Sequence, residues 1–467
     1  MLALQDILPV RNMTVGQRRA HDGHWPQLVV WLFFSVLPLS LAAQENATDA
    51  VDAPVAAPSA AIITRIEFVG NRVTEPRIML QEMLVKDGDV ADPSLIERSR
   101  QAIMDLGLFV SVRAALETDE DGAAVLRITV KEKYYILPVP KLNRDEQNRF
   151  NPGAELTLNN LAGLNQTLKL RYETQVADGL SGGNIKTTSL GYAYPRVLGG
   201  QYLFSTDISQ SHAPAELVTD GVLESLYELQ AWTASVQVSR WIAPTGPSRG
   251  WQVGGGLVWR HNNYDYVSYA QTDTFQNSQA VGVTVLGQFL DVHDYLYSRG
   301  GVQYGYTGEY GMPLLGSDTL YTRHAFFYRR YILLEGRPHE NIDIQALLGL
   351  SSGDMFSGDT YAYGIGGSRN LRGYASGSIT GNAYTVFNIQ YLRPFFGYYP
   401  LRGVVFLDIG NAYPSNDQLH LGDLKWSTGL GLRFRLKSFV NIELRVDVAY
   451  AYDTGQVKVI AGTKEAF

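Results

Sequence analysis

The sequence predicts an α+β module followed by an all-β transmembrane antiparallel β-barrel of about sixteen strands. Three observations predict this fold class. An apolar export signal stands near the N-terminus, a short β-α-α-β-β pattern follows it, and the rest of the chain alternates apolar and charged residues with a period of two. The 46 Gly, 28 Tyr and 18% charged residues among 467 fit many strands joined by polar loops.

The composition excludes several classes of protein. The net charge of −7 argues against a nucleic-acid binder, which would carry a basic patch. The absence of cysteine excludes disulfides, thiol catalysis and cysteine-ligated metals. Outside residues 28–43, no apolar run approaches the ~20 residues that a membrane-spanning helix needs. On composition alone, a soluble all-β protein and a transmembrane barrel both remain.

The first 42 residues are predicted to be a secretory signal peptide. A basic stretch precedes the apolar run 28–41, and the small residues Ser40 and Ala42 stand at the spacing that a signal peptidase needs. Met13 is a second candidate for the start of translation. An anchored helix is the alternative, which the proline inside the run and the polar segment after it disfavour. The Ala- and Pro-rich residues 43–61 are predicted to be a flexible linker.

Residues 62–133 are predicted to form a small α+β domain. A turn signal, Gly70-Asn71, closes its first strand, and Pro93 fits the first turn of its second helix. The expected strands cover residues 62–69, 109–116 and 125–130, and the expected helices cover residues 75–84 and about 93–106.

Residues 134–467 are predicted to form the barrel. In the segment 439–452, one face is apolar and begins with Val440 and Ile442, whereas the other carries charged residues such as Glu443. A period of two with one apolar and one charged face places one face in lipid and the other in water. At roughly 21 residues for a strand and its connection, this part of the chain would form about sixteen strands.

A soluble β-sandwich would show the same alternation. The export signal and the charge on the polar face both favour the barrel. Tyrosines at expected strand ends fit the aromatic girdle of a membrane barrel: these are Tyr192, Tyr194, Tyr202, Tyr295, Tyr297, Tyr398 and Tyr399. Open strands cannot cross lipid because unpaired backbone groups are costly there, so the sheet is expected to close.

The N-terminal domain resembles a POTRA domain, a periplasmic module that precedes the barrel in the BamA/TamA superfamily of outer-membrane proteins. One copy is visible, because the preceding linker is too short for another. The resemblance is carried by three short patterns: Ile66-x-Phe68-x-Gly70-Asn71, Leu106-Gly107-Leu108-Phe109 and Leu126-x-Ile128-x-Val130-x-Glu132.

The barrel region resembles the same superfamily, in its surface-antigen-type barrel, at four places in order. These are a turn motif with Asp291, Asp294, Arg299 and Gly300; a lumenal loop with its tip at Leu371, Arg372, Gly373 and Tyr374; a strand with Phe406, Asp408 and Gly410; and an aromatic C-terminal signal, Phe467.

The loop tip suggests a specific contact. An arginine held inside a barrel needs a counter-charge, because an unpaired buried charge is costly. Asp408 could accept a two-pronged contact from Arg372, and Gly373 would let the backbone pack closely against the wall. The resemblance implies a glutamate as second acceptor, but Gln390 stands there, which removes one charge. The alternative is that Arg372 is a solvated loop residue.

The first barrel strand, expected over residues 135–142, contains two prolines. Residues two apart direct their N–H groups to the same edge of a strand, so Pro138 and Pro140 both delete donors from one edge. One hypothesis is that this edge faces the last strand and leaves a weak seam, through which the superfamily is thought to admit substrate strands. The alternative, given equal weight, is that the two prolines mark a rigid hinge between the two domains.

The sequence offers little support for an enzyme. It has no G-x-S-x-G elbow, H-E-x-x-H motif or phosphate loop. Asp291, His293 and Asp294 could contribute to a metal site, but such a site needs three or four donors, and the turn motif explains the aspartates better. We therefore expect no catalytic residue, no metal and no cofactor.

The resemblance implies an outer-membrane insertase or translocase with its POTRA domain in the periplasm of a diderm bacterium. Its expected partners are outer-membrane lipids, unfolded outer-membrane or secreted proteins, and a periplasmic or inner-membrane partner docked on the POTRA domain, with no nucleic acid. A two-partner-secretion translocator is a second possibility, although its two POTRA copies and plug helix are not visible. A passive pore or structural barrel without insertase activity is the alternative from a different class, and an outer-membrane enzyme is the weakest.

Overall fold

The computed structural model describes residues 61–144, 150–177, 180–197, 200–356, 361–440 and 442–463. The predicted signal peptide, almost all of the predicted linker and Phe467 lie outside these residues. Within the described part of the chain, no helix is long and apolar enough to cross a membrane.

The N-terminal module packs two helices against a three-stranded sheet of order β1-β3-β2. The β1 and β3 strands are parallel, and β2 and β3 are antiparallel. Asp92 caps the second helix by accepting a hydrogen bond from the Ser94 backbone N–H, and Pro93 occupies its first turn. The elements are β1 (Ile63–Val69), α2 (Pro76–Leu80), α3 (Pro93–Met104), β2 (Phe109–Thr118) and β3 (Ala124–Glu132).

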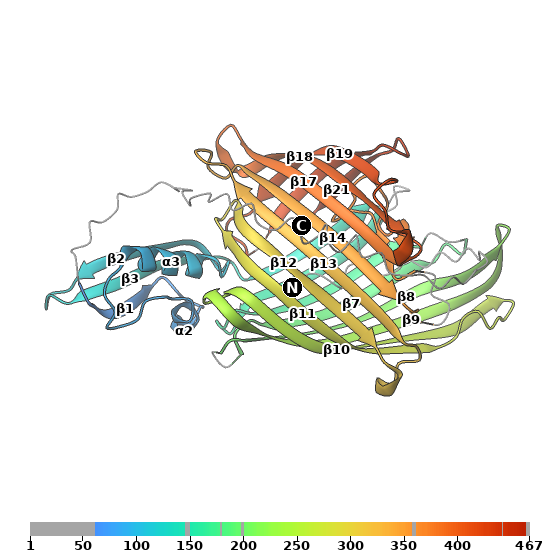
Figure 1. The fold of residues 1–467 in the computed structure, drawn as a ribbon, viewed down its shortest axis with the longest axis horizontal. Coiled ribbons are helices and arrows are strands. Elements are labelled where there is room, and N and C mark those ends of the chain that lie inside the picture. Colours follow the sequence, from blue (N-terminus) through green and yellow to red (C-terminus); the bar gives the residue numbers. More distant parts are fainter. Residues whose placement is uncertain are drawn as a thin grey trace.

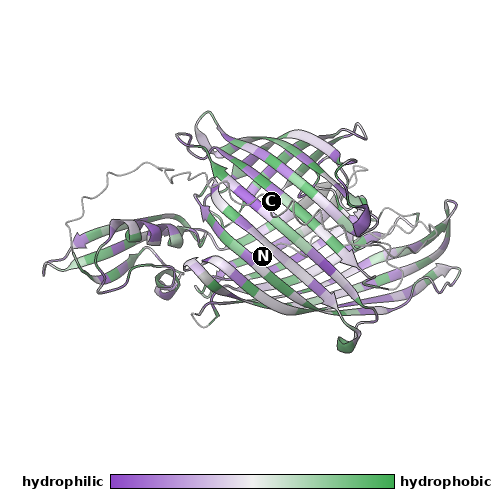
Figure 2. Ribbon diagram, in the orientation of Figure 1, coloured by the Kyte–Doolittle hydropathy of each residue, from purple (hydrophilic) through white to green (hydrophobic). Residues whose placement is uncertain are grey.

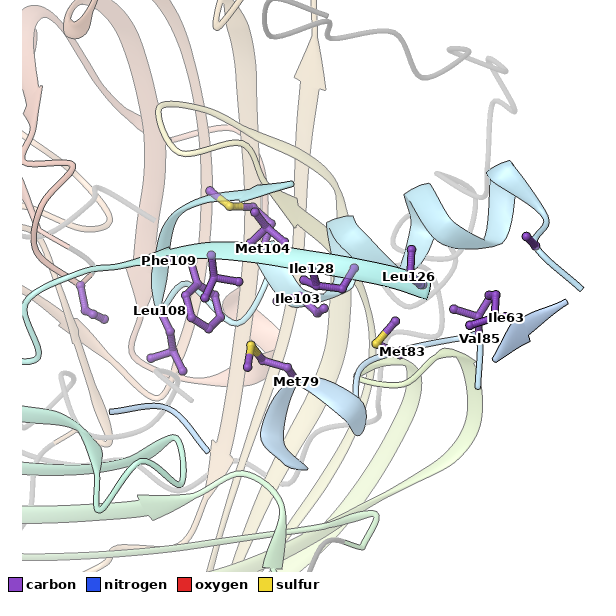
Figure 3. Close-up of a cluster of buried hydrophobic side chains, with 14 of the residues drawn as sticks. Ile63, Met79, Met83, Val85, Ile103, Met104, Leu108, Phe109, Leu126 and Ile128 are labelled. Atoms are coloured by element: carbon purple, nitrogen blue, oxygen red, sulfur yellow. The ribbon is translucent and has the colours of Figure 1, made fainter. Parts of the chain in front are cut away.

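An apolar core holds this module together, and Figure 3 shows it between the sheet and the helices. Ile63, Ile103 and Phe109 are fully buried in it. Tyr135 and Val440 belong to the same core, although they come from the barrel region of the sequence. The module is therefore continuous with the base of the barrel.

Among the described residues, sixteen strands form one antiparallel sheet in which almost every strand pairs with its neighbours in sequence. Figure 1 shows this sheet curled into a barrel, with the N-terminal module at one end. The strands are β4 (Ile136–Arg144), β5 (Phe150–Leu161), β6 (Gln166–Val176), β7 (Asn184–Tyr194), β8 (Tyr202–Thr219), β9 (Val222–Gly246), β10 (Arg249–Tyr269), β11 (Ser278–Asp294), β12 (Arg299–Gly311), β13 (Tyr321–Leu333), β14 (Asn341–Ser352), β17 (Ala383–Phe395), β18 (Tyr398–Tyr413), β19 (Lys425–Arg435), β20 (Glu443–Ala451) and β21 (Val457–Gly462).

The strands bury charged residues and expose apolar ones. In β20, Glu443 and Asp447 are 2% and 0% exposed, whereas Leu444 and Val446 are 41% and 46% exposed. Figure 2 shows the same alternation of hydrophilic and hydrophobic residues over the strands. A soluble sandwich would bury the apolar face, so this inverted pattern identifies a barrel with a polar lumen and a lipid-facing exterior.

Two tryptophans of β10 mark the height of the lipid-facing band. Trp251 and Trp259 are both exposed, and the exposed residues Val253 and Leu257 lie between them. This stretch covers about 26 Å along the strand at the usual rise per residue. Because barrel strands tilt by about 35–45°, it rises roughly 20 Å and so spans most of the apolar band of about 25 Å in outer-membrane barrels, which aromatic girdles flank on both sides. The seven tyrosines expected at strand ends all lie at the module's end of the barrel.

Two details of the sequence prediction are wrong. The first helix of the module ends at Leu80 and not at residue 84, because the chain turns there and carries Glu82 towards Arg196 on the barrel. Val440 and Ile442 are buried, at 5% and 4% exposure, and do not face lipid. They precede β20, where the chain still contacts the module.

Candidate functional site

A long loop between β14 and β17 enters the lumen. It forms a short hairpin of β15 (Tyr363–Ile365) and β16 (Ile379–Gly381), which contacts β18. The residues predicted as the loop tip lie between these two strands. Leu371 and Arg372 are 0% and 1% exposed, so the tip is packed against the wall and is not a solvated loop.

Arg372 makes a two-pronged contact with Asp408 of β18. The distances are 2.7 Å from Nε to Oδ2 and 2.7 Å from Nη2 to Oδ1, and the Arg372 backbone N–H also donates to Oδ2 at 3.0 Å. The guanidinium carbon lies 3.5 Å from the centre of the Phe406 ring, a close cation–π contact. Asp408 is fully buried, so the pair is shielded from solvent screening.

Gln390 of β17 is also at the site. Its Oε1 accepts from Arg372 Nη1 at 3.3 Å, and its amide nitrogen donates to Asp343 of β14 at 3.1 Å. Asn388 completes this wall by donating to Asp408 at 2.8 Å. The glutamine thus bridges a cation and a carboxylate, which a glutamate at the same position could not do.

Asp447 of β20 is a member of the site that the sequence reasoning missed. Its Oδ2 lies 3.8 Å from Arg372 Nη1, and its two oxygens accept from Arg433 at 2.6 and 3.1 Å. The alternation in β20 predicts that Asp447 faces the lumen. The sequence does not say which group it meets there, because that depends on how the barrel curves.

The other two tip residues contact the last strands. Gly373 has a φ of 95°, and a Cβ there would lie 3.3 Å from both the Ala451 backbone nitrogen and the Ser427 side chain. Tyr374 donates to Asp453 at 2.5 Å, immediately after β20. A residue other than glycine at position 373 would therefore strain the backbone and crowd the wall.

The turn motif lies at the junction between the module and the barrel. Asp294 caps its own turn by accepting from the Leu296 N–H at 2.8 Å, and its carboxylate lies 3.3 Å from Arg435. Asp105, at the end of α3, accepts from the Asp294 backbone N–H at 2.9 Å. Arg299 packs over the Tyr331 ring, at 5.8 Å from its centre.

Asp291 is more exposed than the rest of the motif, and its carboxylate is 4.0 Å from His293. Gly300 lies under Leu333, whose side chain would be 2.9 Å from an added Cβ. His293 contacts Asp105 at 3.2 Å and Arg249 at 2.9 Å. Among the described residues, no group of three or more His, Asp or Glu side chains is placed to hold a metal.

Further contacts join the module to periplasmic turns of the barrel. Thr74 and Tyr135 share a hydrogen bond of 3.0 Å, and Asn160 donates to Thr74 at 2.8 Å. Glu132, at the end of β3, accepts from the backbone N–H groups of residues 72–74. Burial raises the pKa of Glu132, but these hydrogen bonds outweigh it and leave the pKa below its usual value.

The prolines of β4 lie on the edge that faces away from β5. Tyr135, just before β4, accepts from the Asn159 N–H, and the register places residues 138 and 140 at the alternate, non-hydrogen-bonded positions of the β4–β5 ladder. Their nitrogens therefore point to the opposite edge. The strand order ends at β4 and β21, and among the described residues no ladder joins these two strands.

Together, the polar lumen, the inserted loop and the docked module define an outer-membrane β-barrel with a periplasmic domain. Comparisons with known proteins identify the family to which it belongs. The family model described as the Omp85 superfamily domain matches residues 160–458, and the POTRA model, described as a surface antigen variable number repeat, matches residues 61–133. The chain belongs to the Omp85 superfamily, which confirms the predicted resemblance, and its POTRA domain lies in the periplasm.

One curated relative is the outer membrane protein assembly factor BamA of Nitratidesulfovibrio vulgaris, 37% identical over 71 residues. That match covers 15% of this chain and 9% of the relative's own length. Two solved structures share the fold. CdiB from Acinetobacter baumannii is 13% identical, with a TM-score of 0.57 over 86% of this chain and 73% of the other. CdiB from Escherichia coli is 15% identical, with a TM-score of 0.58 over 85% and 75%.

Proposed function

We propose that this protein inserts proteins into the outer membrane, or translocates them across it, through a barrel that opens laterally between β4 and β21. Unfolded outer-membrane or secreted proteins are the substrates, and the POTRA domain receives them or a partner protein by strand addition. No nucleotide is required, because the folding of the substrate and its strand pairing supply the free energy.

The edge of β4 carries this proposal. A strand that ends a sheet offers unpaired backbone groups to an incoming strand. Pro138 and Pro140 lack the N–H groups that would pair this edge, so a closing strand would form fewer hydrogen bonds there. A weakly paired seam lowers the cost of exchanging the native neighbour for a substrate strand.

The contacts of Tyr135 fix the start of β4 to the POTRA domain, as the alternative of a rigid hinge between the two domains would also require. Its side chain is 9% exposed, belongs to the core of the POTRA domain and bonds to Thr74. The first residues of β4 thus follow the POTRA domain directly. A movement of that domain would be transmitted to the seam strand, which suits a substrate that arrives from the periplasm.

The lumenal loop disfavours the passive-pore alternative. It packs its tip against the wall with buried ion pairs, and Met355 and Phe356 pack against Tyr321 inside the barrel. A permanently open channel would leave its lumen free for water. The loop takes up part of the space that a pore would use.

Reconstitution tests the proposal. Purified protein is placed in liposomes, an unfolded barrel substrate is added, and its folding is followed by heat-modifiable migration against empty vesicles. Acceleration by the wild type that Arg372→Ala abolishes would support an insertase whose loop tip matters. Arg393→Ala is the matched control, because that side chain is 69% exposed and outside the lumen. No acceleration together with a large ion conductance would overturn the proposal in favour of a pore.

A further inference from the structure

The loop tip is attached to the three strands that precede the seam strand β21. Arg372 binds β18 through Asp408, and Gly373 packs between β19 and β20. Tyr374 bonds both to the Trp426 carbonyl of β19, at 3.2 Å, and to Asp453. The loop tip therefore contacts the barrel wall from β18 to β20, the strand that pairs with β21.

Asp447 is the charged group that brings β20 into this arrangement. It is completely buried and lies among three guanidinium groups, those of Arg372, Arg433 and Arg445. Two of these cations have a second carboxylate partner, since Arg372 also pairs with Asp408 and Arg433 also lies 3.8 Å from Glu443. Arg433 fixes the orientation of Asp447 by two hydrogen bonds, which leaves Oδ2 facing the loop tip as well.

The residues around Gln390 explain why the second carboxylate comes from β20 and not from β17. The Gln390 amide donates to Asp343, so a glutamate there would lose the hydrogen bond and place two carboxylates against each other. The charge that is missing at position 390 is therefore supplied to the same Nη1 atom by Asp447, from β20 on the other side of β18.

We infer that Asp447 is the second carboxylate that holds Arg372, and that it ties the loop tip to β20 and so positions the seam strand β21. Asp447 is a positioning residue: it acts on the seam through Arg372 and through the pairing of β20 with β21. The inference rests on the proposed function only for the importance of the seam, and its test needs no substrate.

The absence of cysteine allows a clean labelling experiment. Spin labels at Ile136→Cys of β4 and Val459→Cys of β21, both exposed in the wild type, report the width of the seam. Hydrogen exchange of the amides of residues 366–376 reports the seating of the tip. Heat-modifiable migration confirms that each variant is folded.

We expect Asp447→Asn to speed tip exchange about tenfold and to broaden the label distances. Glu309→Gln is the matched control and should change neither, because this buried lumenal carboxylate lies on β12 and pairs with Arg260 of β10. Tyr374→Phe keeps all charges and the volume, and should broaden the seam by cutting the other link to β20. It keeps the inference testable if Asp447→Asn does not fold.

Moving the carboxylate from position 447 to position 390 separates the two roles of Asp447, which are to hold Arg372 and to tie the loop tip to β20. Asp343→Asn with Gln390→Glu restores a carboxylate at position 390, because the asparagine introduced at position 343 can then donate to it. Added to Asp447→Asn, this pair should slow tip exchange again and leave the seam broad, because position 390 lies on β17. The inference is overturned if the seam narrows as well, if tip exchange stays fast, or if Asp447→Asn alone changes nothing.

Arg433→Gln tests whether the effects come only from losing the Arg433–Asp447 pair. It should leave the tip protected, and a variant that reproduces both effects would overturn the inference. A chain that responds as expected but does not insert substrate would overturn the proposed function and leave this inference standing.

Discussion

Glu82 of the POTRA domain and Arg196 of the barrel form a buried ion pair, with 2.7 Å between Oε1 and Nη2. Their side chains are 2% and 11% exposed. Ser248, in the turn between β9 and β10, donates to the same carboxylate at 2.9 Å, and Arg196 also donates to the Pro247 carbonyl at 2.6 Å. A glutamate of the small domain thus joins two turns of the barrel.

Breaking this pair from one side should release the POTRA domain. Arg196→Met removes the cation closest to the buried Glu82, and breaking a buried pair from one side typically costs about 3–5 kcal/mol. We expect faster proteolysis of the domain junction and a wider distance distribution between labels on the POTRA domain and the barrel. Glu82→Gln with Arg196→Met should recover part of the loss, and equal losses in the single and double variants would contradict the role of the pair.

The turn between β5 and β6 should be equally important for holding the POTRA domain against the barrel. Gly163 has a φ of 73°, and a Cβ there would lie 2.1 Å from the Val73 carbonyl oxygen of the POTRA domain. Gly163→Ala should therefore separate the two segments, seen as faster hydrogen exchange of residues 71–78. Gly221→Ala is matched in backbone, with a φ of 79° and nothing within 4 Å, and should cost only the backbone strain of about 1 kcal/mol.

The sequence predicts the barrel and its strands well because the alternation of side chains along a strand is a local property. The period of two identifies which side chains face lipid, and the confirmed count of sixteen strands follows from chain length. Arg372 and Asp408 make the two-pronged contact expected from the cost of an unpaired buried charge. Asp447 and Glu82 could not be matched to their partners, because curvature and docking bring together positions far apart in sequence. Val440 departs from the pattern because the POTRA core takes it in.

Lys133 should make the stability of the POTRA domain depend on pH. Its side chain is 5% exposed and donates to the Gly107 carbonyl at 2.9 Å. Burial lowers the pKa of Lys133 to about 8, despite the opposing attraction of Asp294. The unfolded chain, with a lysine near its usual pKa of 10.5, binds more protons between these values, so stability should rise as the pH goes from about 8 to 10.5.

The rise between pH 7.5 and 9.5 should be on the order of 1–2 kcal/mol. Pulse proteolysis of the POTRA domain over a urea series in detergent measures it, with heat-modifiable migration as the check that the barrel stays folded. Lys133→Met removes the titrating group and should be more stable than the wild type at pH 7.5, with little change up to pH 9.5. A wild type that loses stability over this interval would contradict the assignment.

Replacing both prolines of β4 tests the seam itself. Pro138→Val with Pro140→Val restores two N–H donors on the edge that faces away from β5, so β21 can pair more fully with β4. Each added hydrogen bond should contribute about 1 kcal/mol, and opening the seam should become correspondingly harder. We therefore expect a higher yield of cross-links between β4 and β21 and slower substrate folding in the liposome assay.

Pro214→Val is the matched control for this prediction. Pro214 lies within β8, opposite Glu228 of β9 and far from β4 in the strand order. It changes the same residue type in a strand that is paired on both sides, so cross-linking and activity should stay at the wild-type level. If the double variant leaves both unchanged as well, the prolines do not weaken the seam. A variant with more cross-links and full activity would instead show that substrates enter without opening this edge.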